Sequence, residues 1–125
     1  MKGPKLGKVQ LQIMQVLWNK GKASAREITE TLNRGEPIAH STVQTLLRQL
    51  ETKGVVSHER DRRTFVFHPL VNRASVARTE IRRLTERLFG GSAGGLMAYL
   101  LKEERIDPDE FDEIKRLVEA REEQP

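Results

Sequence analysis

The chain has 125 residues, a net charge of +4, no cysteine and only 5% aromatic residues. Its length suits one ordinary domain or two small units with a mostly aliphatic core, and the missing cysteines exclude disulfides, thiol nucleophiles and thiolate metal sites. No apolar run is long enough to cross a bilayer, and no signal-type apolar stretch follows the N-terminus, so we expect a cytoplasmic protein without direct membrane binding.

The first part of the chain predicts two helices. Apolar residues at spacings of three and four indicate one buried face of the first helix, which ends at Lys20-Gly21. These residues are Val9, Ile13, Val16 and Leu17. Ser24 predicts the start of a second helix, because Glu27 stands three residues later and the two can form a capping box. A turn is expected over residues 34–37, which include a glycine and a proline.

A third helix is predicted between a cap at Ser41 and a stop at Lys53-Gly54, where a cation and a glycine are typical of a helix end. Its apolar residues form one continuous face. They are Val43, Leu46, Leu47 and Leu50. Burial of this face leaves the opposite, polar side of the helix toward solvent or a ligand.

The hydrophobic period then changes from 3.6 to 2, which predicts two strands, over residues 55–59 and 64–68. Asp61-Arg62-Arg63 lies at the tip between them, and Pro69 ends the second strand. Three helices followed by a hairpin is the order of a winged helix-turn-helix. We therefore expect a mainly α fold with a small β-hairpin, and a winged-helix DNA-binding domain over residues 1–71.

Residues 72–125 predict three more helices. The first starts near Ala74 and stops at Gly90-Gly91, and the last starts at Asp107-Pro108, an N-cap followed by a proline in the first turn. So short a segment cannot bury three apolar helix faces by itself, and a second copy of the chain is the simplest cover. The expected dimerisation residues are Ala77, Ile81, Leu84, Leu88, Leu96, Leu100, Phe111, Ile114 and Leu117.

The charge is divided unevenly between these two parts. Residues 1–71 contain twelve Lys or Arg and six Asp or Glu, a net of +6, whereas residues 72–125 contain ten and twelve, a net of −2. Basic residues concentrated in one half suggest that this half binds a polyanion.

The polar side of the third helix carries side chains suited to a DNA major groove. Arg48 can pair with guanine, Gln44 with adenine, and Thr45 can contact a base edge. Ser41 and Thr42 are expected near phosphates, as is His40 just before the helix. Arginines at the hairpin tip can contact the sugar-phosphate backbone or the minor groove. The predicted DNA-binding residues are His40, Ser41, Thr42, Gln44, Thr45, Arg48, Arg60, Arg62 and Arg63.

Three stretches, Leu11–Trp18, His40–Gly54 and Phe65–Val71, resemble the penicillinase-repressor (BlaI/MecI/CopY) family of transcriptional regulators. The break at Gly90-Gly91 and the leucine-rich helix after it also fit that family, so the resemblance covers nearly the whole chain. It implies a homodimeric repressor that binds double-stranded operator DNA of palindromic sequence, with the third helix contacting the bases.

Two departures from the family pattern bear on regulation. The copper-responsive branch binds metal through C-terminal cysteines, which this chain lacks. In the β-lactam-responsive branch a membrane sensor triggers cleavage at an Asn-Phe bond, and the aligned position here is Arg83-Leu84. Derepression by a partner sensor or protease is therefore left open.

Other sites were weighed against this interpretation. His58 and His68 lie on paired strands, but no further ligand completes a metal site, and the acids after residue 106 are interpreted as a solvated helix start rather than a calcium loop. No nucleophile elbow or glycine-rich cradle indicates an enzyme, and no cofactor or metal is expected. The alternative function is a winged-helix adaptor that binds proteins, because a fold does not determine a function.

Overall fold

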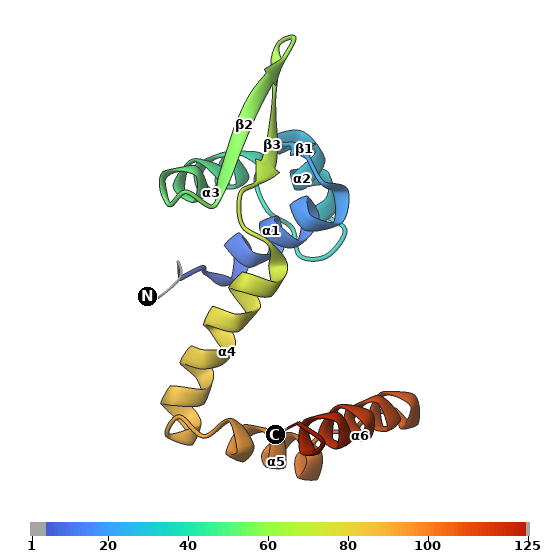
Figure 1. The fold of residues 1–125 in the computed structure, drawn as a ribbon. Coiled ribbons are helices and arrows are strands. Elements are labelled where there is room, and N and C mark those ends of the chain that lie inside the picture. Colours follow the sequence, from blue (N-terminus) through green and yellow to red (C-terminus); the bar gives the residue numbers. More distant parts are fainter. Residues whose placement is uncertain (1–4, 125) are drawn as a thin grey trace. The chain divides into compact units, whose positions relative to one another are not determined.

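The computed structural model describes residues 5–124 and divides into two compact units, Met1–Ile81 and Arg82–Pro125 (Figure 1). The first four residues of the expected 1–71 domain, and the last residue of the expected 72–125 domain, lie outside the described part of the chain. In chain order the elements are α1 (Lys8–Lys20), β1 (Ala23–Ser24), α2 (Ala25–Leu32), α3 (His40–Thr52), β2 (Val56–Asp61), β3 (Thr64–Pro69), α4 (Arg73–Phe89), α5 (Ala93–Glu103) and α6 (Pro108–Glu122). The predicted fold class, mainly helical with a small hairpin, is confirmed.

Helix boundaries in the first unit follow local chemistry. Gly21 ends α1 with a φ of 86°, a conformation that glycine adopts without steric cost. The predicted capping box of α2 is present: Ser24 Oγ accepts from the Glu27 amide at 3.2 Å, and Glu27 Oε1 accepts from the Ser24 amide at 2.9 Å. These contacts explain why α2 starts directly after the two residues of β1.

The predicted cap of α3 was wrong. The helix starts at His40 with Ala39 as its N-cap, and no side chain caps it. Because Ala39 has an extended backbone and its carbonyl already accepts from the amides of Thr42 and Val43, Ser41 lies inside the first turn. The Ser41 side chain is exposed, so it is available to a ligand rather than used as a cap.

The sheet has three antiparallel strands in the order β1-β3-β2, one more than the predicted hairpin. The additional strand, β1, pairs Ala23 with Phe67, and a strand of two residues is too short to give a hydrophobic pattern. In the hairpin, called the wing below, His58 pairs with Phe67 while His68 pairs with Ser57. The two histidines therefore point to opposite faces of the sheet, which removes the geometry for a shared metal.

The core of the first unit lies between α1, α2, α3 and the base of the wing (Figure 1). On α3, Val43, Leu47 and Leu50 are fully buried, whereas Leu46, predicted to belong to the same face, is only partly buried. Each buried aliphatic side chain contributes roughly 1.5–3 kcal/mol relative to exposure. The three together fix which side of α3 faces outward.

Contacts beyond residue 71 explain why the first unit extends into α4 rather than ending before it. Val76 of α4 is only 5% exposed and belongs to the core. The indole Nε1 of Trp18 donates to the Val71 carbonyl at 2.9 Å, and the Arg73 guanidinium lies 5.5 Å from the centroid of the indole ring. The expected boundary after residue 71 thus precedes the first turns of α4, which pack on α1.

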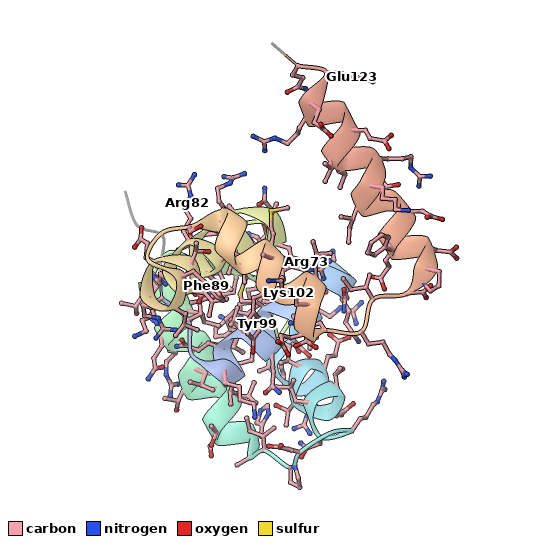
Figure 2. All side chains as sticks on the ribbon, turned by 90° about the horizontal axis from the view of Figure 1, so that it is seen from below. Arg73, Arg82, Phe89, Tyr99, Lys102 and Glu123 are labelled. Atoms are coloured by element: carbon pink, nitrogen blue, oxygen red, sulfur yellow. The ribbon has the colours of Figure 1, made fainter. Side chains whose placement is uncertain are left out.

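The second unit contains the end of α4 together with α5 and α6. Gly90 and Gly91 end α4 with positive φ values, and Ser92 Oγ caps α5 by accepting from the Gly95 amide at 2.9 Å. The rings of Phe89 and Tyr99 lie 5.8 Å apart (Figure 2). None of the described residues of α5 or α6 is buried.

The residues expected at a dimer interface are mostly exposed to solvent in the single chain. Leu84, Leu96 and Ile114 are partly buried, and the others are exposed. Leu88 is 67% exposed and Leu117 59%. No helix formed by the described residues has the length and apolar character needed to span a bilayer.

Candidate nucleic-acid interface

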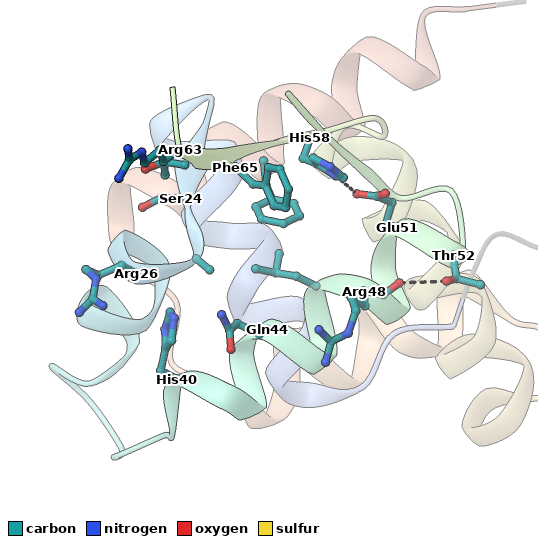
Figure 3. Close-up of a pocket in the computed structure, with 14 residues that line it drawn as sticks. Ser24, Arg26, His40, Gln44, Arg48, Glu51, Thr52, His58, Arg63 and Phe65 are labelled. Carbon is teal, nitrogen blue, oxygen red and sulfur yellow. Dashed lines mark hydrogen bonds and ion pairs between the residues drawn. The ribbon is translucent and has the colours of Figure 1, made fainter. Parts of the chain in front are cut away.

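An open groove of about 900 Å³ lies between the start of α2, the outer side of α3 and the inner side of the wing (Figure 3). It brings together residues from three segments of the chain that are far apart in sequence. Of the residues predicted to bind DNA, it is lined by His40, Gln44, Arg48 and Arg63. Ser41, Thr42, Thr45, Arg60 and Arg62 lie outside its lining.

The exposed side of α3 presents the predicted base-contacting residues. Gln44, Thr45 and Arg48 are all exposed, opposite the buried face. The Thr45 hydroxyl donates to the Ser41 carbonyl at 3.0 Å, and Arg48 Nη2 donates to Thr45 Oγ1 at 3.3 Å. The guanidinium is thus held against the helix by one long hydrogen bond, and its other N–H groups face outward and can donate to a ligand.

The start of α3 is tied to α2 by a side-chain contact. His40 is half-buried, and its Nδ1 lies 3.0 Å from Thr29 Oγ1. Ser41 and Thr42 follow as exposed residues of the first turn. A ligand that meets the N-terminal end of α3 would therefore contact two hydroxyls and one imidazole.

The tip of the wing carries three exposed arginines in a tight turn. Arg62 has a φ of 61°, a left-handed conformation that costs a non-glycine residue roughly 1–2 kcal/mol. Arg60 Nε donates to the Arg62 carbonyl at 3.2 Å, and the Arg60 guanidinium lies 5.9 Å from the centroid of the Phe65 ring. Of the three, only Arg63 lines the groove, so the three guanidinium groups do not gather at one place in it.

An aromatic cluster forms the wall of the groove on the wing side, and sequence reasoning missed it. The His58 ring packs at a tilt against Phe65 and Phe67, with ring centroids 4.6 and 5.3 Å away, and its Nδ1 lies 2.5 Å from Glu51 Oε1 (Figure 3). Phe67 is buried, but Phe65 is 49% exposed. Alternation along the strand already placed both phenylalanines on one face, and that signal could have identified Phe65.

Arg26 of α2 is a second lining residue that the sequence did not suggest. It joins Arg48 and Arg63 as the third arginine in the lining, beside the imidazoles of His40 and His58. The one carboxylate in the lining, Glu51, is engaged by His58. The groove therefore presents cationic rims over an apolar wall, which suits a polyanion with an apolar framework such as the sugar-phosphate chain of a nucleic acid.

No group of three or more potential metal ligands comes together within residues 5–124. Arginine, glutamine and hydroxyl groups dominate the exposed side of α3, and these donate or accept hydrogen bonds without holding a metal.

The chain is similar in sequence to known repressors. The family model described as penicillinase repressor matches residues 6–120. The chain is 22% identical over 116 residues to the penicillinase repressor of Bacillus licheniformis, covering 93% of this chain and 91% of that protein. It is 21% identical over 113 residues to the methicillin resistance regulatory protein MecI of Staphylococcus aureus (strain N315), covering 90% of this chain and 92% of that one.

A solved structure is also similar. The solution structure of monomeric Bacillus licheniformis BlaI in complex with the blaP half-operator superposes with a TM-score of 0.52 at 28% identity, covering 59% of this chain and 92% of that chain.

Proposed function

The chain belongs to the penicillinase repressor family, a family of DNA-binding transcriptional repressors, and we propose that it binds a two-fold symmetric operator as a homodimer. One observation carries the proposal: burial of Val43, Leu47 and Leu50 turns Gln44, Thr45 and Arg48 outward beside a groove with cationic rims. BlaI, which superposes on 59% of this chain, has been solved in complex with the blaP half-operator.

The residues divide into two roles. Gln44, Thr45 and Arg48 would contact base edges, because they stand on the exposed side of α3 and a recognition helix lies in the major groove. The remaining predicted residues would contact the backbone. They are His40, Ser41 and Thr42 at the start of α3, and Arg60, Arg62 and Arg63 on the wing.

The groove adds two residues to this set. Arg26 would contact a phosphate from the α2 side. Phe65 would pack against a deoxyribose, because it is the exposed aromatic residue on the side of the wing that faces the groove. A DNA strand that lies along the groove would then be held from both sides.

The homodimer is supported by the second unit. Large apolar side chains on α4, α5 and α6 are exposed; they include Leu88, Met97, Tyr99, Leu101 and Leu117. A segment of this size does not cover such faces alone, and a second copy would cover them with the same surfaces. Two recognition helices about 34 Å apart would then read a repeat with two-fold symmetry.

We propose that the chain acts in the cytoplasm, where a repressor of this kind would meet its operator. Derepression through proteolysis by a partner sensor is kept as an open part of the proposal. Arg83 and Leu84, the residues that the sequence analysis compared with the cleaved bond of that family, lie within the regular helix α4.

The experiment is a selection of genomic fragments by the full chain, followed by sequencing and by titration of the recovered site. The proposal expects a palindromic site, bound far more tightly than random duplex and by two chains. Recovery of no enriched sequence, together with affinity that does not depend on salt, would leave the protein-binding adaptor as the better interpretation.

A further inference from the structure

The hydrogen bonds around His40 restrict which of its ring nitrogens can carry a proton. Nδ1 lies 3.0 Å from the hydroxyl of Thr29, a residue that is only 8% exposed. The same hydroxyl donates to the Ala25 carbonyl at 2.8 Å. A threonine hydroxyl has one proton, so both contacts are satisfied only if Thr29 Oγ accepts from His40 and Nδ1 carries the hydrogen.

The other ring nitrogen is then the one left for a ligand. Nε2 has no hydrogen-bond partner among residues 5–124. In a neutral imidazole with its proton on Nδ1, Nε2 presents a lone pair, which repels a phosphate oxygen. Only the imidazolium form presents an N–H there.

We propose that Thr29 is a positioning residue that holds His40 in the Nδ1–H form, so that His40 binds an operator phosphate only as imidazolium and each subunit takes up a proton on binding. The inference rests on the proposed function, in which α3 meets DNA. Operator affinity would then respond to pH through a residue at the start of the recognition helix.

The charged groups that share the groove with His40 come from all three of its walls. They are Arg26 from α2, Arg48 and Glu51 from α3, and His58 and Arg63 from the wing. The arginines stay charged at every pH of interest, and Glu51 is paired with His58. His58 is the other group that could take up a proton, so the experiment must separate it from His40.

The first measurement needs no DNA. Long-range nitrogen-proton correlation spectra of the free full-length chain above neutral pH should show the His40 proton on Nδ1. In Thr29→Val, which keeps the branched shape and lacks the hydroxyl, the proton should move in part or wholly to Nε2. A wild-type His40 protonated on Nε2 would overturn the inference whatever the chain binds.

The second measurement is operator affinity against pH at fixed salt. For the wild type, affinity should fall with rising pH by up to tenfold per unit for each half-site, the limit for uptake of one proton. His40→Gln, which keeps a neutral N–H donor, should remove that part of the slope, and Thr29→Val should flatten it by allowing neutral His40 to donate. His68→Gln, on the other face of the sheet, is the matched control and should keep the wild-type slope.

The outcomes separate this inference from the proposed function. If operator binding is tight but His40→Gln keeps the wild-type slope, or if His58→Gln removes it instead, the role of His40 is wrong and the repressor function stands. If no operator is bound at any pH, the proposed function fails. The spectra of the free chain still show whether His40 carries its proton on Nδ1.

Discussion

His58 on β2 contacts Glu51 on α3 and so joins the wing to that helix, with Nδ1 and Oε1 2.5 Å apart. The two side chains are 33% and 39% exposed, so the contact is at the edge of the groove and not in the core. Because His58 also packs against Phe65 and Phe67, the pair sets where the aromatic wall stands relative to α3.

The first prediction concerns this pair. A double-mutant cycle with Glu51→Gln and His58→Ala should give a coupling of at most about 1 kcal/mol in urea unfolding, because solvent screens a pair that is one-third exposed. DNA binding should respond asymmetrically. His58→Ala leaves an unpaired carboxylate in the groove and should weaken binding, whereas Glu51→Gln should not. Equal losses for the two variants would contradict an electrostatic role.

The second prediction concerns Arg48. Arg48→Ala should cost on the order of 1–3 kcal/mol on the operator if the guanidinium pairs with a base in bidentate fashion, and much less on random duplex. Thermal unfolding should barely change, because Arg48 is exposed. Arg121→Ala, an exposed arginine of α6, is the control. Similar losses on both DNAs, measured by fluorescence anisotropy, would reassign Arg48 to a phosphate.

The third prediction concerns the tip of the wing. Arg62→Ala combined with Arg63→Ala should weaken binding to all duplexes by similar factors. The slope of log affinity against log salt should become shallower by roughly 0.9 for each DNA phosphate that the variant no longer neutralises. If binding weakens while the slope is unchanged, these arginines do not contact phosphates.

The fourth prediction concerns self-association. Leu88→Asp and Leu117→Asp should each weaken the dimer in sedimentation experiments at micromolar concentration, because a carboxylate would be buried in an apolar interface. The fold of the subunit should survive, since these side chains are 67% and 59% exposed within it. Gln124→Glu adds a charge at the exposed end of the chain and serves as the control. A monomeric wild type would contradict the proposed homodimer.

The fifth prediction concerns the start of α2. The Ser24 amide donates to the Glu27 carboxylate and lowers the pKa of Glu27 below its ordinary value. The stabilisation is therefore complete above the ordinary carboxyl pKa and disappears as the pH falls through the lowered, folded-state pKa. In urea unfolding at several pH values, Glu27→Gln should lose this pH-dependent part. Ser24→Ala should lower the free energy of unfolding by about 1 kcal/mol at neutral pH. An unchanged free energy of unfolding would show that the cap does not stabilise the fold.

Several features of the fold were predictable because their causes are local in sequence. Ser24 and Glu27 form their box within one helical turn, and the glycines at 90 and 91 end α4 with positive φ. The apolar period of α3 predicted its buried side correctly except for the degree of burial of Leu46. The buried side of α3 is enough to predict that Gln44, Thr45 and Arg48 face outward.

Other features were missed because a local pattern competed with a better tertiary alternative. Ser41 has the chemistry of an N-cap, but the extended Ala39 starts the helix earlier. β1 is defined only by its pairing with β3, a partner more than forty residues later.

The sequence by itself determined the order of the elements, the buried side of α3 and the basic character of the first half, because periodicity, capping and charge are properties of neighbouring residues. Only the tertiary structure decided which side chains meet across the groove. Thr29 reaches His40, and Glu51 reaches His58, through the packing of α2 on α3 and of the wing on α3. Such contacts depend on how whole elements pack, and no spacing within a single element encodes them.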